Sequence, residues 1–422
     1  DAFECLLLAK VPGSRRQLFT RLLADDPSWI LKPEIARFVQ ARRQDLLTPF
    51  LKPQVFKGVG ARGNADTLPA FEHGHHRWTQ KQQETYSRSI LTMMHQGQHG
   101  HFEMRFGIRT LARMPAISLQ PVKDLAALSN SDAESRDIAL VALGIADARR
   151  GMETLVEALG DDRARIAIYA MRPSLLDMPT DEALQALGRA PLGKVTVAKE
   201  VIRIAGDLEG AAACDFLNGI LSRPDLHRHV RIVGLRALWS HLDQPASWDV
   251  IEVAACDPDP DQALAAVRIP QDGLLRQMQP RLATLMAKLV HHQAPVVRLQ
   301  TLYDLARNPI RLSGTSLLEA LFERLEKASF EEATQAVAAL ARGLDDRKME
   351  RLGRAIAGIG EPRVLQSAIT ALISESNPSL IAGENTRLAA RHTVDRLIDG
   401  GRFIGLAVEL AMATFSAGDL ED

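Results

Sequence analysis

Apolar residues recur along most of the chain at the three- and four-residue spacing of an amphipathic helix, and short polar segments interrupt them at regular intervals. From about residue 102 the chain divides into units of roughly 29 to 36 residues that begin alike. Each unit opens with an arginine followed by small and aliphatic residues at i, i+3, i+4 and i+7, in segments 104–114, 135–145, 164–173, 229–242 and 296–309. This pattern predicts one helix with a single buried face at the start of each unit.

A second apolar helix follows each first helix after a short turn. These second helices are expected in segments 151–160, 211–221, 246–255 and 316–328. The junctions between units are rich in Asp, Ser, Asn, Gly and Pro, which start and stop helices. A repeated helix, turn and helix predicts an all-α fold in the form of an α-solenoid of helical hairpins.

One unit carries the pattern most clearly and resembles the HEAT repeat family, in its short bacterial form. In residues 131–171 the resemblance rests on Asp132, Arg136, Gly144, Asp147 and Arg149, and on the segment "LVEALGD" at 155–161. It implies that turn aspartates pair with helix arginines of neighbouring units, and that Gly144 permits a tight turn. The likeness extends over about 102–410 and weakens after residue 255. Unit 260–293 departs from it, with Pro270 and Pro280 where the first helix is expected.

Residues 1–101 follow no such register, although segments 15–25, 32–51 and 77–96 still show helical periodicity. We expect an atypical helical N-terminal cap, because one face of a terminal repeat has no neighbour. A long loop is expected at about 53–76, where polar and turn-forming residues gather. Residues 411–422 are expected to form an acidic tail after the repeat array.

Charge divides the chain unevenly. Residues 1–118 contain 17 Lys and Arg against 10 Asp and Glu, whereas the rest contains 34 against 42. The basic end indicates a possible nucleic-acid partner, with phosphate contacts from a basic patch and stacking from interleaved aromatics. The patch comprises Arg15, Arg16, Arg42, Arg43, Lys57 and Arg62, and the aromatics are Phe50, Phe56, Phe71 and Trp78.

Motifs that suggest catalysis or a cofactor are weak. Gly58, Gly60 and Gly63 match G-x-G-x-x-G, but the flanking residues predict neither the strand before it nor the helix after it that phosphate binding requires. His95, His99 and His101 are weak candidates for a metal site, and a second group of histidines, at 73, 75 and 76, lies in the predicted loop. We therefore expect no enzyme activity, no cofactor and no bound metal.

Two enzyme families with related repeats were considered as alternatives. Trp239 and Asp243, four residues apart on a predicted helix face, resemble the Trp and Asp pairing of HEAT-like DNA glycosylases. The short repeat itself is shared with bilin lyases, although no distinguishing residue supports that activity here.

The favoured function is a protein–protein interaction scaffold or adaptor, on a curved surface built by the second helix of each repeat. Cysteines occur only at 5, 214 and 256, and no apolar run reaches the length of a membrane span, so a bacterial-type cytoplasm is expected. Nucleic-acid binding through the basic N-terminal region is the alternative. The candidate contact residues for a protein partner are Glu153, Glu157, Asp215, Asn218, Arg281, Lys288, His291 and Glu319.

Overall fold

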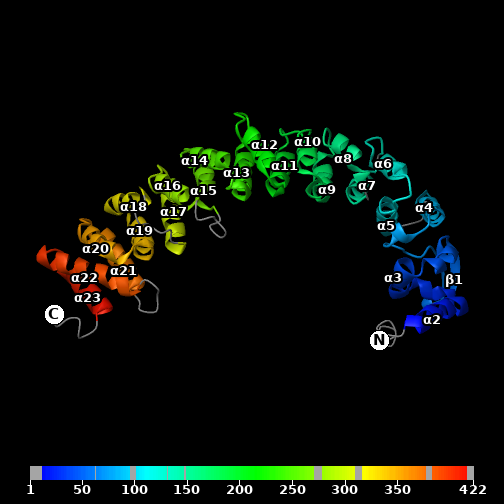
Figure 1. Cartoon of the computed structure of the whole chain (residues 1–422), viewed down its shortest axis with the longest axis horizontal. Helices are drawn as coiled ribbons and strands as arrows, with labels where there is room; N and C mark the ends of the chain where they lie inside the picture. The colour runs from blue at the N-terminus through cyan, green and yellow to red at the C-terminus, as the bar shows by residue number, and fades with distance from the viewer. Residues whose placement is uncertain are drawn as a thin grey trace. The chain divides into compact units, whose positions relative to one another are not determined.

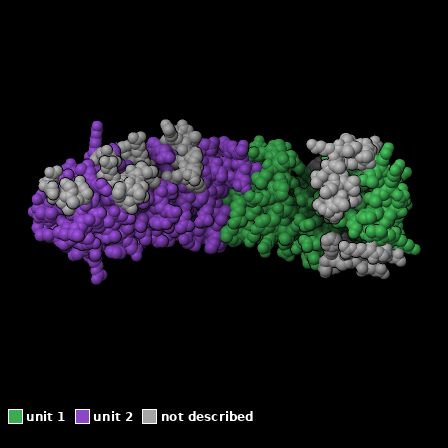
Figure 2. Space-filling model, turned by 90° about the horizontal axis from the view of Figure 1, so that it is seen from below, with its two compact units in different colours: residues 1–204 green, residues 205–422 purple. Residues whose placement is uncertain are grey.

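The computed structural model describes residues 12–61, 63–95, 101–130, 132–146, 149–269, 278–308, 316–376 and 383–415. These residues are predominantly helical, which confirms the all-α solenoid predicted from the periodicity. The chain divides into two compact units, Asp1–Ile204 and Ala205–Asp422, which Figure 2 colours separately. The boundary that the sequence places between cap and repeats, at residue 101, stays a prediction.

The first part of unit 1 combines short helices with a small hairpin. Strand β1 (Gln54–Gly58) pairs antiparallel with β2 (Gly63–Thr67), with Phe56 opposite Ala65 and Gly58 opposite Gly63. The α-helices are α2 (Pro12–Asp25), α3 (Pro33–Arg42) and α4 (Gln80–His95). Short 3₁₀ turns connect them: η1 (Pro27–Leu31), η2 (Gln44–Leu46), η3 (Thr48–Phe50), η4 (Val59–Ala61) and η5 (His75–Arg77).

The hairpin corrects the prediction of a structureless loop at 53–76, and it explains the glycines. Gly60 lies against η1, where its N–H donates to Ser28 Oγ at 2.9 Å and a Cβ would stand 2.1 Å from the Ser28 carbonyl oxygen. Gly58 adopts a φ of 147°, which L side chains rarely adopt. A strand does precede the G-x-G-x-x-G segment, contrary to expectation. The second strand begins at Gly63, where a phosphate-binding loop requires a helix N-terminus, so the hairpin accounts for this motif.

An aromatic cluster fills the core of the same region. Phe71 and Tyr86 are fully buried and Trp78 nearly so, with ring centroids 5.5 to 5.6 Å apart. The Tyr86 hydroxyl donates to the Pro69 carbonyl at 2.6 Å and accepts the Phe71 N–H at 3.0 Å. Phe50 and Phe56 are buried as well. These four predicted stacking platforms, Phe50, Phe56, Phe71 and Trp78, are therefore core residues, which corrects their assignment to a nucleic-acid surface.

The remainder of unit 1 is a stack of helical hairpins. Helix α5 packs on α7 and α7 on α9, while α6 and α8 cover these helices from the other layer (Figure 1). Gly144, at the end of α7, allows close packing against the next repeat, because a Cβ there would stand 2.2 Å from the Ala170 carbonyl oxygen of α9. The bounds are α5 (His101–Ala112), α6 (Gln120–Ala126), α7 (Ala133–Gly144), α8 (Met152–Ala158), α9 (Ala164–Leu176), α10 (Thr180–Leu187) and α11 (Val195–Asp207).

Unit 2 repeats the two-layer arrangement. First helices α13, α15, α17, α19, α21 and α23 contact one another in turn, and the second helices α16, α18, α20 and α22 do the same in the other layer (Figure 1). The first-layer bounds are α13 (Arg228–Ala237), α15 (Pro260–Val267), α17 (Pro295–Arg307), α19 (Phe330–Gly343), α21 (Pro362–Glu375) and α23 (Ile404–Thr414). The second layer comprises α12 (Ala211–Leu221), α14 (Pro245–Ala254), α16 (Gln279–Val290), α18 (Ser316–Glu326), α20 (Met349–Ala357) and α22 (Gly383–Asp399), with 3₁₀ turns η7 (Leu238–His241) and η9 (Asp346–Lys348).

Two details of unit 2 differ from the sequence prediction. Pro280 lies in the first turn of α16 instead of interrupting a helix, because a first-turn proline lacks only an N–H that has no helical partner. Pro270 and the acidic residues after 415 lie outside the described residues. Helix α23 continues to Thr414, past residue 410 where the array was expected to end.

A recurring arginine ties first helices to the turn that precedes them. Arg136 donates to the Asn130 carbonyl at 3.0 Å, Arg231 to Leu221 at 2.7 Å and Arg298 to His292 at 2.9 Å. The aspartate–arginine pairing between units that the resemblance implies occurs where Arg228 bonds to Asp259 and Asp261. These helix arginines therefore satisfy turn carbonyls as well as carboxylates.

Candidate functional site

Several predicted contact residues on the second helices bind their neighbours in the stack. Arg281 of α16 pairs with Asp249 and, at 2.8 Å, with Glu252 of α14. Lys288 reaches the same Glu252 at 3.0 Å, and the two cations outweigh burial and lower the pKa of that carboxyl. Glu319 of α18 forms two bonds, of 2.7 and 2.6 Å, with Arg351 of α20. These charges link successive second helices.

The other predicted contact residues are spread over separate helices. Glu153, Glu157 and Asp215 are exposed, with the carboxylate of Glu153 3.9 Å from Lys123 Nζ. Asn218 is half-buried and donates to the Cys214 sulfur at 3.4 Å. The exposed His291 lies 3.6 Å from the carboxylate of Glu323. The role of these residues as contacts stays a prediction.

A groove between the first helices α17 and α19 presents apolar side chains to solvent. Val296 is 53% exposed, Tyr303 40% and Phe330 56%, and they line a depression of about 520 Å³. Val296 lies in the first turn of α17, and Phe330 begins α19, directly after the Ser329 N-cap. The remaining lining residues are Leu299, Gln300, Glu331, Thr334 and Gln335. Sequence periodicity assigned such residues to the core, so this groove was missed.

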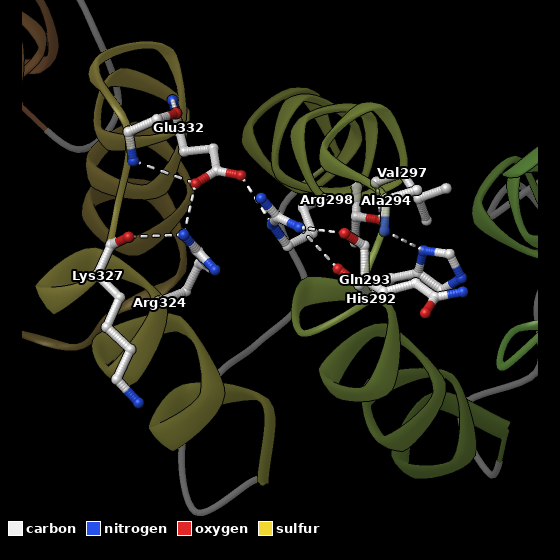
Figure 3. A network of polar contacts seen from close by, with 10 residues as sticks. His292, Gln293, Ala294, Val297, Arg298, Arg324, Lys327 and Glu332 are labelled. Carbon is white, nitrogen blue, oxygen red and sulfur yellow. Dashed lines mark hydrogen bonds and ion pairs between the residues drawn. The ribbon is translucent and has the colours of Figure 1, made fainter. Parts of the chain in front are cut away.

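A buried charge network holds the two sides of this groove in place. Figure 3 shows the Glu332 carboxylate between two guanidinium groups, accepting from Arg298 Nε at 2.8 Å and from Arg324 at 2.7 Å. It also closes the capping box of α19 by accepting the Ser329 N–H at 3.1 Å. Burial raises the pKa of Glu332, but the Ser329 N–H and the two arginines outweigh it, so the pKa lies below its ordinary value. The ionised carboxylate thereby joins α17, α18 and α19.

A second depression, of about 380 Å³, lies in unit 1 beside α5. Arg105, Arg109 and Arg113 line it at four-residue intervals, and all three are exposed. Arg113 donates weakly to the Glu72 carbonyl at 3.5 Å, and no ion pair to any of the three is found among the described residues. Phe106, Thr110, Glu72 and His73 complete the wall. The four-residue spacing of these arginines is visible in the sequence, but segment 104–114 was interpreted only as the first helix of a repeat.

The basic patch predicted from the sequence is only partly open. Arg42 and Lys57 are exposed. Arg43 is buried, with its guanidinium bonded to Asp45 at 2.8 Å and to Thr20 at 2.9 Å, so its inclusion in an open basic surface is corrected. The side chains of Arg15 and Arg16 and the whole of Arg62 lie outside the described residues.

The histidines of the predicted loop have different environments. His75 is buried and bonds to the Phe71 carbonyl at 3.2 Å, and burial lowers the pKa of its imidazole to about 4. His73 and His76 are exposed. The side chains of His95 and His101, and all of His99, lie outside the described residues. Among those described, no three His, Cys, Asp or Glu side chains are placed to hold a metal ion.

The residues considered for a glycosylase-like site do not share a helix face. Helix α13 ends at Ala237, and Trp239 lies in the 3₁₀ turn η7, with Asp243 exposed beyond it. Trp248, the next tryptophan, is buried and donates to the Leu242 carbonyl at 2.7 Å. The change of helix type separates Trp239 and Asp243, so the four-residue spacing that suggested this alternative does not place them on one helix face.

Comparison with known proteins supplies no functional assignment. No protein-family model matches the chain, and a search of curated proteins also gives no match. Among solved structures, an engineered protein is similar over 79% of this chain and 94% of its own, with 16% identity and a TM-score of 0.34. Importin beta, crystallised in an ammonium sulfate condition, is similar over 82% of this chain and 55% of its own, with 14% identity and a TM-score of 0.37. None of the described helices has the length and apolar character needed to cross a membrane.

Proposed function

We propose that this chain is a non-catalytic protein-interaction scaffold of the HEAT-like type, and that a partner protein binds the groove between α17 and α19. The observation that carries the proposal is the solvent exposure of Val296, Tyr303 and Phe330 around one depression. Exposed aromatic and aliphatic side chains around a concave site are typical of the desolvated centre of a protein interface.

The groove favours a helical segment that presents apolar side chains. Its walls are the neighbouring first helices α17 and α19. The depression between them can accept the side chains along one face of a helix from the partner. The exposed Glu331 at the rim favours a lysine or arginine beside the apolar anchors of the partner. The buried network at Glu332 supports this role, because it fixes the groove before binding and so reduces the entropy lost on association.

Two further proposals accompany this function. The second-helix positions predicted from the sequence would serve a scaffold mainly by joining repeats, since Arg281, Lys288 and Glu319 are engaged with neighbouring helices. A cytoplasmic setting is proposed on the cysteines, because Cys214 and Cys256 are both free thiols.

The test is a quantitative affinity purification from the native host with the wild-type chain and with a Tyr303→Ser, Phe330→Asp double variant. We expect one or more host proteins to be recovered with the wild type and to decrease at least tenfold with the double variant, because both anchors of the groove are lost. Reconstitution from the purified partner then establishes direct binding.

The matched control is a Glu319→Gln, Arg351→Gln variant, which alters an exposed charge pair on the second-helix layer. It is expected to recover the same proteins as the wild type. Equal recovery with the groove variant, or loss with the control variant alone, would place the interaction elsewhere and contradict the proposal.

A further inference from the structure

We propose that the pocket beside α5 binds the phosphate backbone of a single-stranded nucleic acid, through Arg105, Arg109 and Arg113. This site is separate from the groove of the proposed function, and it is built from residues other than the basic patch predicted from the sequence. Only the basic character of the N-terminal region is shared with that prediction.

The three arginines form a regular row. A spacing of four residues on an α-helix advances by about 6 Å and rotates by about 40°. Arg105 and Arg109 therefore lie on one face of α5, and Arg113 directly follows the last residue of this helix, with its backbone N–H bonded to the Arg109 carbonyl at 3.3 Å. Each guanidinium offers a fork of donors that matches two phosphate oxygens. A row of such forks suits a chain of repeated phosphates better than one compact anion.

The charge of the row is not cancelled by the surrounding protein. Most arginines in the repeats contact a carboxylate or a turn carbonyl, as Arg163 does with Asp161 at 2.6 Å. No such carboxylate partner of Arg105, Arg109 or Arg113 is found in the described part of the chain. Among the described residues, Glu72 is the one acidic side chain that lines the pocket, and its carboxylate lies 3.8 Å from the ring of His73. Three permanent cations against one carboxylate leave the pocket basic.

The basic surface continues beyond this pocket. A neighbouring depression of about 310 Å³ shares Glu72 and His73 with it and is lined by the exposed Arg37. The exposed Arg77 lies close by in the chain, with its guanidinium anchored to the Ala41 carbonyl at 2.7 Å. An extended ligand longer than one nucleotide therefore meets further cations.

The composition of the pocket favours nucleic acid over an acidic protein. The centres of protein interfaces are depleted in charge and rich in exposed apolar side chains. Among the described residues, no large apolar side chain of this pocket is as exposed as those at α17 and α19, and Phe106 is only half-buried. Phe106 and His73 instead provide flat rings beside the phosphate-binding groups, on which a base can stack.

The experiment measures binding of the full chain to a fluorescein-labelled 20-nucleotide mixed-sequence strand, as DNA and as RNA, by anisotropy over a series of salt concentrations. The test variant is Arg105→Gln, Arg109→Gln, Arg113→Gln. The control variant is Arg165→Gln, Arg189→Gln, Arg236→Gln, which removes three exposed arginines outside the pocket and changes the net charge equally.

We expect the wild type to bind at low salt, and the slope of log K against log salt to fall in magnitude by about 2 in the test variant, because three phosphate contacts are lost at about 0.7 each. The control variant is expected to keep the wild-type slope. Circular dichroism of both variants checks that the helices are intact.

Three outcomes would overturn the proposal. They are absence of binding to both strands at low salt, an equal decrease in the slope for the control variant, and competition by poly-glutamate as effective as competition by the unlabelled strand. The last result would assign the pocket to an acidic protein segment. None of these outcomes bears on the groove between α17 and α19, whose test uses different variants and a protein readout.

Discussion

The groove between α17 and α19 and the pocket beside α5 use arginine in opposite ways. At the groove, Arg298 and Arg324 are turned inward and neutralised by the buried Glu332, and the surface left to solvent is apolar. At the pocket, Arg105, Arg109 and Arg113 are exposed and no carboxylate in the described residues neutralises them. Helical hairpins of one general design thus present either an apolar or a cationic surface.

The difference depends on whether an acidic residue is placed about one repeat away. Glu332 follows Arg298 by one repeat length and meets it across the interface between α17 and α19. Arg342 and Glu375 repeat this arrangement between α19 and α21, at 2.7 Å. A helix arginine therefore serves the stack where the next repeat supplies a carboxylate or the preceding turn supplies a carbonyl, as for Arg298 and Arg231. In the described part of the chain, Arg105 and Arg109 have no such bond and face solvent.

Removal of the buried Glu332 carboxylate is expected to have the largest effect on the groove. Glu332→Ala leaves Arg298 and Arg324 partly buried without a counter-ion, and we expect a loss of about 3 to 5 kcal/mol in local stability. Amide hydrogen exchange of α17 to α19 measures this loss, and α5 in the same sample serves as an internal reference. Glu319→Gln, in an exposed pair, is expected to cost less than about 1 kcal/mol. Similar exchange in the two variants would show that the network does not hold the groove.

Acid is expected to destabilise the core around Phe71 through the buried His75. Burial first, and then Arg113, His73 and His76, disfavour the imidazolium and lower the pKa of His75 to about 4, against 6.5 for an exposed histidine. The unfolded chain then binds a proton that the folded chain does not, so stability present above pH 6.5 is lost as the pH falls towards 4. The loss amounts to about 3 kcal/mol over that interval.

The measurement is the thermal unfolding of the wild type and of His75→Gln at pH 7.5 and pH 5.0. The wild type is expected to lose more stability on acidification than the variant, which lacks the titrating group. His229→Gln, at an exposed position in unit 2, is expected to retain the wild-type pH dependence. Parallel pH profiles for the wild type and His75→Gln would show that His75 does not carry this effect.

The sequence predicted the solenoid because each helix buries one face against a neighbour, and this leaves a 3.6-residue period that local inspection detects. It did not predict the hairpin at 54–67, because the apolar content of this hairpin is small and its position depends on Gly60 approaching Ser28, 32 residues away. The burial of the aromatic residues 71 and 78 was left open for a related reason. Their burial depends on Tyr86 of α4, which no local pattern connects to them.

The candidate surfaces were harder to predict than the fold. Arg43 and Arg105 both lie in segments predicted to be helical, and the contacts of Arg43 with Asp45 and Thr20 make it a buried structural group. Phe330 and Val337 both follow helical periodicity, yet one is 56% exposed and the other is fully buried, because Phe330 begins its helix at the edge of the groove. Exposure of this kind depends on how neighbouring repeats are offset, which the sequence does not state.

Two single variants, one in the pocket and one in the groove, test whether the two surfaces act separately when each variant is measured in both binding assays. Arg109→Gln removes the central arginine of the row and is expected to weaken oligonucleotide binding about fivefold, through the loss of one charge-assisted contact. Phe330→Asp is expected to change that binding less than twofold while it abolishes partner recovery. Anisotropy and affinity purification of both variants measure the two effects. A variant that impairs both activities equally would show that the two surfaces do not act separately.

The smallest expected effect is a gain in oligonucleotide affinity, whereas the other pocket variants lose affinity. Glu72 is the acidic side chain in the wall of the basic pocket, and it is about half exposed. Its carboxylate repels a bound phosphate across a solvated distance, so Glu72→Gln is expected to tighten oligonucleotide binding about twofold to threefold at low salt, with the gain disappearing at high salt. Anisotropy at two salt concentrations measures this, and Glu84→Gln, an exposed change on α4 outside the pocket, is the matched control. Because a fold defect weakens binding and does not strengthen it, a gain limited to Glu72→Gln separates an electrostatic site from one that depends only on the integrity of the helices.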